Sequence, residues 1–251
     1  MAVLVVVHGA TGGGWEWTGV ARRLRARGHD VFTPTLTGLG ERAHLLSPDI
    51  GLETHITDVV NLVELEDLTH VVLVGHSYGG MVVVGVADRV AGRIARLVIV
   101  DGFLPLPGQS SRDLTDPTFF EDVIARPARE RGDGWRVPPW DDDDDVDPWY
   151  RERVRNHPLR TLTDPIRLEH GPPAHPGTYV RCEYPEKDPS SFASSRDAAL
   201  ALGWDVTAID ALHDVATSDP DLIASFLDGV ATSATGVAVE PRRPSAREER
   251  R

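Results

Sequence analysis

The chain has 251 residues, enough for a sizeable hydrophobic core. Hydrophobic residues make up 41% and charged residues 26%, which is typical of a globular protein and excludes a disordered or fibrous one. Acidic residues outnumber basic ones 39 to 26, and this balance disfavours binding to nucleic acid. The single cysteine, Cys182, excludes both an internal disulfide and a thiolate metal cluster.

Neither a signal peptide nor a membrane span is expected. The apolar opening run at residues 1–7 has no basic region before it. No apolar run approaches the ~18–20 residues that cross a bilayer. We therefore expect a cytoplasmic protein without a membrane partner.

Apolar runs and helical spacing alternate through the first hundred residues. Continuous apolar runs predict strands that are buried on both faces, as in a parallel sheet. The expected strands are Val3–Val7, Asp30–Thr33, Val71–Val74, Leu97–Val100, Thr178–Cys182 and Asp205–Ile209. The expected helices are Trp17–Arg27, Thr54–Leu65 (with Thr54 as N-cap), Met81–Val90, one ending at Ala198–Leu202, and Pro220–Val230. Such alternation predicts a doubly wound, mostly parallel α/β sheet.

This pattern is interrupted from about residue 106 to 176, where proline, aspartate and tryptophan are frequent. A segment of this length is expected to be a lid inserted over the sheet. We assign residues 1–231 to one domain that carries this lid. Residues 232–251, rich in Arg, Glu and Pro, are expected to be a disordered tail.

Ser77 lies in the sequence Gly75-His76-Ser77-Tyr78-Gly79, between a buried strand and an apolar helix. A G-x-S-x-G sequence in that context places a nucleophilic serine on a strained strand-to-helix turn. The helix N-terminus there favours a developing oxyanion. Ser77 is thus the expected nucleophile, against the alternative of a chance glycine–serine turn.

His8-Gly9-Ala10 follows the first strand and predicts the second half of an oxyanion hole. The backbone amides of Ala10 and Tyr78 are the expected donors. A phosphate-binding loop is the alternative, but the glycine spacing at residues 11–14 does not match one.

His213 is the expected general base, because it follows the last predicted strand and the order Ser…acid…His places the histidine there. His8 is expected to hold its loop. His157, in the lid, is expected to be solvated or to face substrate, and His55 to be an ordinary surface or packing residue. No histidine pair has metal-ligand spacing, so we expect no metal and no other cofactor.

The acid that orients His213 is left open among four carboxylates. Asp188 is favoured, because it follows the strand Thr178–Cys182 and lies 25 residues before His213. Asp101 directly follows the strand before that one and could also reach the histidine. Glu186 and Glu183 are candidates as well, since both come after the same strand as Asp188.

The lid is rich in aromatic residues that could bind substrate or could only attach the lid to the sheet. The expected substrate-binding residues are Trp135, Trp140, Trp149 and Phe103. The run Asp141–Asp145 is expected to be a solvated loop.

Three stretches resemble the α/β-hydrolase family: residues 8–17, residues 34–40 and the motif around Ser77. They are similar to plant methylesterases and hydroxynitrile lyases and to bacterial carboxylesterases, including pyrethroid-type hydrolases. The resemblance is strong over residues 3–105 and weaker over 178–230. It implies that Ser77 attacks an ester and that Ala10 donates to the oxyanion. Hydroxynitrile lyases have a lysine beside the catalytic histidine; here Asp214 stands there, which disfavours cyanohydrin cleavage.

The sequence therefore favours a serine hydrolase that cleaves a small or medium carboxylic ester through an acyl-enzyme. One alternative is a thioesterase, lactonase or cyclase that acts on a polyketide-like intermediate in biosynthesis. A ligand-binding protein on a hydrolase scaffold is a further alternative. The expected partner is a small-molecule ester or thioester, and a homodimer is left open.

Overall fold

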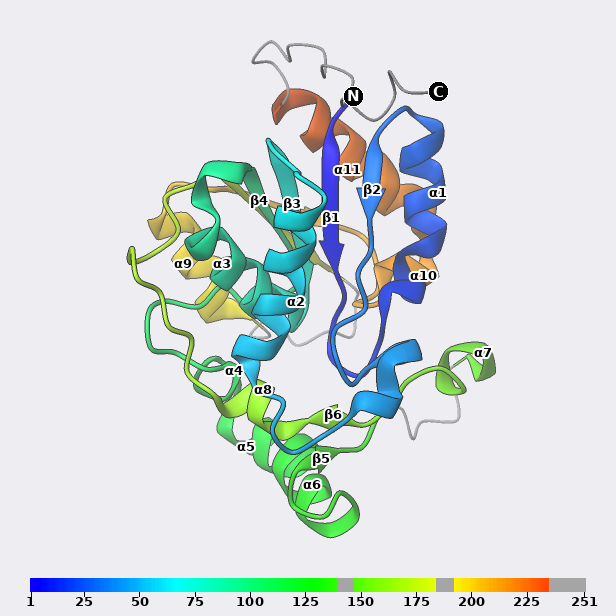
Figure 1. Cartoon of the computed structure of the whole chain (residues 1–251), viewed down its shortest axis with the longest axis vertical. Helices are drawn as coiled ribbons and strands as arrows, with labels where there is room; N and C mark the ends of the chain where they lie inside the picture. Colours follow the sequence, from blue (N-terminus) through cyan, green and yellow to red (C-terminus); the bar gives the residue numbers. More distant parts are fainter. Residues whose placement is uncertain (140–146, 184–191, 235–251) are drawn as a thin grey trace.

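A parallel sheet forms the centre of the molecule (Figure 1). The computed structural model describes residues 1–139, 147–183 and 192–234. Within them, six strands run parallel in the order β2-β1-β3-β4-β7-β8. Their bounds are β1 Val3–Val7, β2 Asp30–Phe32, β3 Val71–His76, β4 Ile94–Val100, β7 Gly177–Cys182 and β8 Asp205–Ile209. The expected doubly wound α/β sheet is confirmed.

Helices cover both faces of the sheet, which explains why the central strands are apolar throughout. Side chains alternate along a strand, so Val5 and Val7 pack into one hydrophobic cluster while Leu4 and Val6 pack into the other. The first face carries α2 (Leu52–Leu65), α3 (Gly79–Arg89) and α9 (Ala193–Ala201). The second carries α1 (Thr18–Ala26), α10 (Val215–Ser218) and α11 (Pro220–Ala234). None of the described helices is long and apolar enough to span a membrane.

Helix boundaries differ from the sequence expectation by one to a few residues, and the ends of α2 and α11 change an assignment. Helix α2 begins at Leu52, so its N-cap is Gly51 and the expected cap at Thr54 is wrong. Thr54 instead occupies the third helical position, where its hydroxyl accepts a hydrogen bond from the Gly51 amide at 3.4 Å. At the other end of the chain, α11 continues to Ala234, past the expected start of the tail at residue 232. Residues 235–251 lie outside the described residues.

The segment from 106 to 176 lies at the carboxyl ends of the strands (Figure 1). Its described residues form short elements: α4 Ser111–Leu114, α5 Pro117–Phe119, a π-helical turn Phe120–Ala125, α6 Arg126–Arg131, β5 Arg136–Val137, α7 Pro148–Arg151, β6 His157–Pro158 and α8 Leu159–Thr163. Strands β5 and β6 pair antiparallel. Its buried side chains, including Val137 and Leu162, join the same hydrophobic cluster as α2 and α3. The insertion is therefore packed onto the sheet domain.

Candidate active site

Ser77 occupies the turn between β3 and α3, with a positive φ of 52°. This left-handed conformation is costly for a residue with a side chain, and it persists only where neighbouring groups enforce it. The Ser77 amide donates to the Val100 carbonyl at 3.1 Å, and the Ser77 carbonyl accepts from the Phe103 amide at 3.1 Å. The partners are the last residue of β4 and a residue of the loop after it, so the neighbouring strand and its loop hold the turn.

The turn leaves no room for side chains on the glycines around Ser77. A Cβ on Gly75 would lie 2.6 Å from the Gly79 carbonyl oxygen. A Cβ on Gly79 would lie 2.5 Å from the Val7 carbonyl oxygen, at the end of β1. These contacts are shorter than van der Waals separation, and they involve backbone atoms that cannot rotate away. The G-x-S-x-G pattern is thus a steric requirement of the turn.

His213 contacts a buried carboxylate beside this turn. Its Nδ1 lies 2.6 Å from Oδ2 of Asp101, the residue that follows β4. The Asp101 side chain is 4% exposed and the His213 side chain 37% exposed. A histidine whose Nδ1–H is held by a carboxylate presents Nε2 as the proton acceptor, which is the arrangement a general base needs.

Backbone contacts fix the position of Asp101. It has a positive φ of 43°, and its amide donates to the Val180 carbonyl on β7 at 2.7 Å. Its Oδ1 accepts from the Cys182 amide at 3.3 Å. One carboxylate oxygen therefore accepts a hydrogen bond from the backbone of β7, and the other accepts one from His213.

The structure describes two of the four carboxylates that the sequence offers, Asp101 and Glu183. Asp188, the favoured one, and Glu186 lie outside the described residues. Glu183 forms an ion pair with Arg181 at 3.1 Å, with its side chain 52% exposed. Of the two that are described, Asp101 is the one that contacts His213.

His76 and Phe192 also contact His213. The buried His76 donates from Nε2 to the His213 carbonyl at 2.9 Å, and the two rings lie 4.7 Å apart. Burial lowers the pKa of His76 to about 4, so this ring is neutral near pH 7. Phe192 stacks on the His213 ring at 5.9 Å with an interplanar angle of 14°. Phe103 in turn packs edge-on against Phe192 at 4.9 Å.

The loop after β1 approaches the serine closely. A Cβ on Gly9 would lie 3.2 Å from the Ser77 Cβ. The neighbouring His8 is fully buried; its Nδ1–H donates to the Gly9 carbonyl at 2.7 Å, and its Nε2 accepts from the Leu36 amide at 3.1 Å. Burial lowers the pKa of His8 to about 3, which preserves this pattern of one donor and one acceptor. His8 thereby holds the loop, as the sequence predicts.

Of the two expected oxyanion donors, Tyr78 directly follows Ser77, and Ala10 follows Gly9, which lies against the Ser77 Cβ. The peptide group is planar, so the bond from His8 to the Gly9 carbonyl also sets the direction of the Ala10 amide. Tyr78 directly precedes α3, where the helix dipole favours negative charge. Among the described residues, neither the Ala10 amide nor the Tyr78 amide donates a hydrogen bond to another group. Both amides are therefore candidate donors to an anionic oxygen.

A buried network beneath the turn was missed by the sequence reasoning. The Tyr78 hydroxyl donates to Nδ1 of His55 at 2.9 Å, and His55 donates from Nε2 to the Thr37 carbonyl at 2.9 Å. Both side chains are at most 1% exposed. His55 is thus a packing residue, as expected, but one whose two ring nitrogens are both hydrogen-bonded. His157 is likewise fully buried, which makes the expected solvated or substrate-facing role wrong. The spacing of the histidines along the sequence does not predict the surroundings of His55 or of His157.

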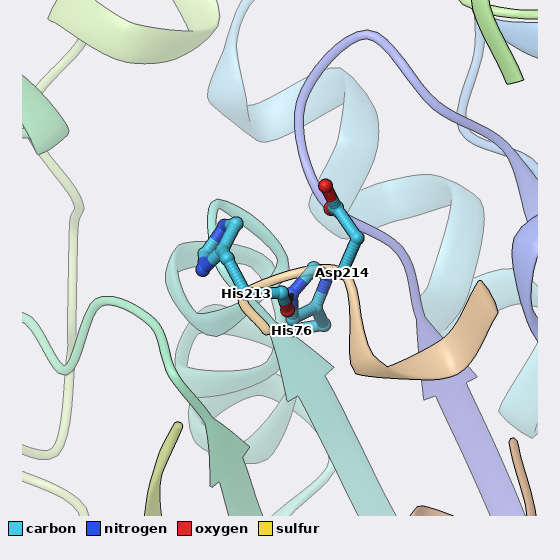
Figure 2. Close-up of side chains that lie close together, drawn as sticks. All are labelled: His76, His213 and Asp214. Carbon is cyan, nitrogen blue, oxygen red and sulfur yellow. Dashed lines mark hydrogen bonds between the residues drawn. The ribbon is translucent and has the colours of Figure 1, made fainter. Parts of the chain in front are cut away.

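The structure also groups His76, His213 and Asp214, whose ligand atoms all lie within 4.8 Å of one another. Figure 2 shows the Asp214 carboxylate pointing away from the His213 ring. Nε2 of His76 and Nδ1 of His213 are already engaged by the His213 carbonyl and by Asp101. Hydrogen bonds thus account for one nitrogen of each ring, and we assign no metal to the group.

The expected substrate-binding aromatic residues lie in different surroundings. Phe103 joins the site through Phe192. The Trp135 ring packs under the Arg136 guanidinium at 5.3 Å, and Trp149, 45% exposed, packs against Trp15 at 5.3 Å. Trp140 and the run Asp141–Asp145 lie outside the described residues.

Comparison with known proteins agrees with this geometry. Residues 4–226 match the model of the alpha/beta hydrolase family. The chain belongs to this family. In this alpha/beta hydrolase, Ser77, Asp101 and His213 follow strands β3, β4 and β8.

Among its relatives is a carbendazim hydrolyzing esterase from Nocardioides sp. (strain SG-4G), 38% identical over 90% of this chain and 98% of that protein. Methylesterase 8 of Arabidopsis thaliana is 33% identical over 40% of this chain and 38% of its own length. Among solved structures, an extracellular alpha/beta-hydrolase from a Paenibacillus species matches with a TM-score of 0.79 at 22% identity, over 92% of this chain and 99% of that one. The last similarity shows the fold alone.

Proposed function

We propose that this alpha/beta hydrolase cleaves small or medium carboxylic esters through an acyl-enzyme, with Ser77 as nucleophile, His213 as base and Asp101 as the orienting acid. The observation that carries the proposal is the 2.6 Å contact between His213 Nδ1 and Asp101 Oδ2, beside a serine held at φ 52°. The relative named as a carbendazim hydrolyzing esterase supports an ester as substrate.

In the first half of the reaction, Ser77 Oγ attacks the ester carbonyl carbon and its proton passes to His213 Nε2. The amides of Ala10 and Tyr78 stabilise the oxyanion of the tetrahedral intermediate. The intermediate collapses, the bond to the alcohol oxygen breaks, and the alcohol leaves with the proton from His213. Asp101 stays ionised and stabilises the imidazolium while it exists.

In the second half, water attacks the acyl carbon and gives a proton to His213. The bond to Ser77 Oγ then breaks, Oγ recovers that proton, and the carboxylic acid is released. The complete reaction consumes only the ester and one water molecule. The His213 side chain is 37% exposed, so water can reach its ring for this step.

The proposal is tested with a fluorophosphonate probe and a panel of p-nitrophenyl esters with short and medium acyl chains. We expect labelling of Ser77, located by mass spectrometry of the labelled peptide, and hydrolysis of the shorter esters. Ser77→Ala should lose both. A folded protein that is not labelled at Ser77 would refute the mechanism.

Labelling without turnover separates the alternatives. Ester hydrolysis that fails across the panel while thioesters or lactones react would favour the biosynthetic thioesterase, lactonase or cyclase. Release of one equivalent of p-nitrophenol without further turnover would favour a ligand-binding protein. The intact pair of Asp101 and His213 supports turnover, because a binder does not need an oriented base.

We further propose that Phe103, Trp135, Trp140 and Trp149 contribute to substrate binding, and that the protein is cytoplasmic, does not bind nucleic acid and uses no cofactor. Phe103 has the strongest support, because it reaches His213 through Phe192. A homodimer is tested by light scattering of the purified chain. Cell fractionation tests the location, since one protein of similar structure is extracellular.

A further inference from the structure

Thr11, the residue after the proposed oxyanion donor Ala10, is bonded to the insertion through both of its backbone groups. The Thr11 carbonyl accepts from the Arg155 amide at 2.8 Å. The Thr11 amide donates to Nδ1 of His157 at 3.2 Å. Thr11 has a positive φ of 62°, an unfavourable conformation for a β-branched residue that these two contacts help to enforce.

The ring of His157 is fixed in the tautomer that accepts from Thr11. The Thr161 hydroxyl donates to the Pro158 carbonyl at 2.8 Å, so its oxygen accepts from Nε2–H of His157 at 2.7 Å. Nδ1 is left without a proton and faces the Thr11 amide. His157 and Thr161 are both fully buried, which holds the pKa of His157 well below its usual range and keeps the ring neutral.

The Ala10 amide therefore lies between two backbone groups of the loop that are fixed by hydrogen bonds. On one side, His8 holds the Gly9 carbonyl at 2.7 Å. On the other, the insertion holds Thr11. Each peptide unit is planar, so fixing the groups before and after Ala10 leaves its N–H little freedom to rotate.

We propose that His157 is a positioning residue for the reaction: through Thr11, it keeps the Ala10 amide aimed at the oxyanion. This inference rests on the proposed function and goes beyond it, because it assigns the insertion a part in transition-state stabilisation. Removing an oxyanion donor outright costs about 10²–10³ in kcat. Loosening one should cost less, about 10-fold to 100-fold, with KM nearly unchanged because the oxyanion exists only in the transition state.

The test compares three variants with the wild type on the best p-nitrophenyl ester. His157→Leu removes the acceptor for Thr11 and should lower kcat about 10-fold to 100-fold with KM changed less than about threefold. His157→Gln carries an amide that can accept from Thr11 and donate to Thr161, and it should recover most of that loss. Leu162→Ala is the matched control: it removes a buried side chain of the same insertion, 3% exposed, without touching the hydrogen bonds.

A purely structural role for His157 predicts a different pattern. In that case His157→Leu and Leu162→Ala would both lower the urea midpoint, and neither would change kcat per folded molecule by more than about twofold. That result, or an equal loss of kcat in both variants, overturns the proposal.

If His157→Leu does not fold, Thr161→Val takes its place, since it keeps His157 but removes the group that fixes its tautomer. It should lower kcat about threefold to tenfold, and an unchanged kcat would overturn the proposal. Labelling of Ser77 by the fluorophosphonate separates the two hypotheses. A wild type that is not labelled refutes the proposed function, whereas full but slower labelling of His157→Leu supports the positioning role.

Discussion

Oδ2 of Asp101 lies 2.6 Å from Nδ1 of His213, across a sequence separation of 112 residues. Asp101 follows β4, which pairs with β3, and β3 leads directly into Ser77. The carboxylate, the base and the serine turn are therefore assembled from the carboxyl ends of strands in one parallel sheet. Asp101 is therefore the first carboxylate to replace.

Replacing Asp101 by Asn should lower kcat by several orders of magnitude, because the amide no longer holds the Nδ1–H tautomer or stabilises the imidazolium. KM should change little, since an orienting carboxylate need not touch substrate. Steady-state kinetics of Asp101→Asn and Asp188→Asn check this, with folding verified by circular dichroism. If Asp188→Asn is inactive and Asp101→Asn keeps nearly full activity, Asp188 is the residue that orients His213.

The serine turn should tolerate no side chain at Gly75. Gly75→Ala places a methyl group 2.6 Å from the Gly79 carbonyl oxygen, and we expect it to lower the free energy of unfolding by about 1–3 kcal/mol and to abolish labelling of Ser77. Gly92→Ala is the matched control, because its added Cβ meets nothing within 4 Å. Urea unfolding of both variants gives the comparison, and equal midpoints would contradict the steric argument.

The Tyr78 hydroxyl should matter for stability rather than for chemistry. Tyr78→Phe leaves the buried Nδ1 of His55 without its donor, at a cost of about 1–3 kcal/mol. Burial raises the pKa of Tyr78, so the phenol remains a neutral donor over the working range. The proposed oxyanion donor is the backbone amide, which the substitution retains, so kcat per folded molecule should stay within about threefold. A much larger loss would assign the hydroxyl itself a catalytic part.

Acid should destabilise the fold well before its carboxylates titrate. Burial lowers the pKa of His8 from 6.5 to about 3, and those of His55 and His76 to about 4. The unfolded chain binds these protons first, so the stability they contribute is complete above pH 6.5 and is lost as the pH falls toward 4. The slope approaches about 1.4 kcal/mol per pH unit for each such histidine. Urea unfolding across the range from neutral pH to about 4.5 measures it.

The stabilising carboxylates lose their contribution in a lower range. Desolvation alone would raise the pKa of Asp88, but hydrogen bonds from residues 169 and 170 outweigh it and lower that pKa below 3.8, so its effect is lost only beneath that value. The interval between pH 6.5 and 4 therefore reports on the buried histidines. A flat free energy of unfolding across that interval would show that they are not held neutral in the fold.

The sequence by itself determined the sheet and the serine turn, because both depend on local signals. Continuous apolar runs predict β1, β3 and β4, and the glycines around Ser77 are dictated by close backbone contacts at the turn. His213 could be selected for a similar reason: it follows the last strand, and the chain order leaves little choice. The proposed donor role of Ala10 rests on its place after His8-Gly9.

Only the tertiary structure decided which carboxylate meets His213 and what the buried histidines do. Asp101 and Asp188 each follow a strand, and sequence does not show how far the histidine loop reaches across the sheet edge. His157 meets Thr11 across 146 residues, through an insertion whose periodicity is weak. Such contacts depend on how separate segments pack, and burial then selects the neutral tautomers that make each hydrogen bond.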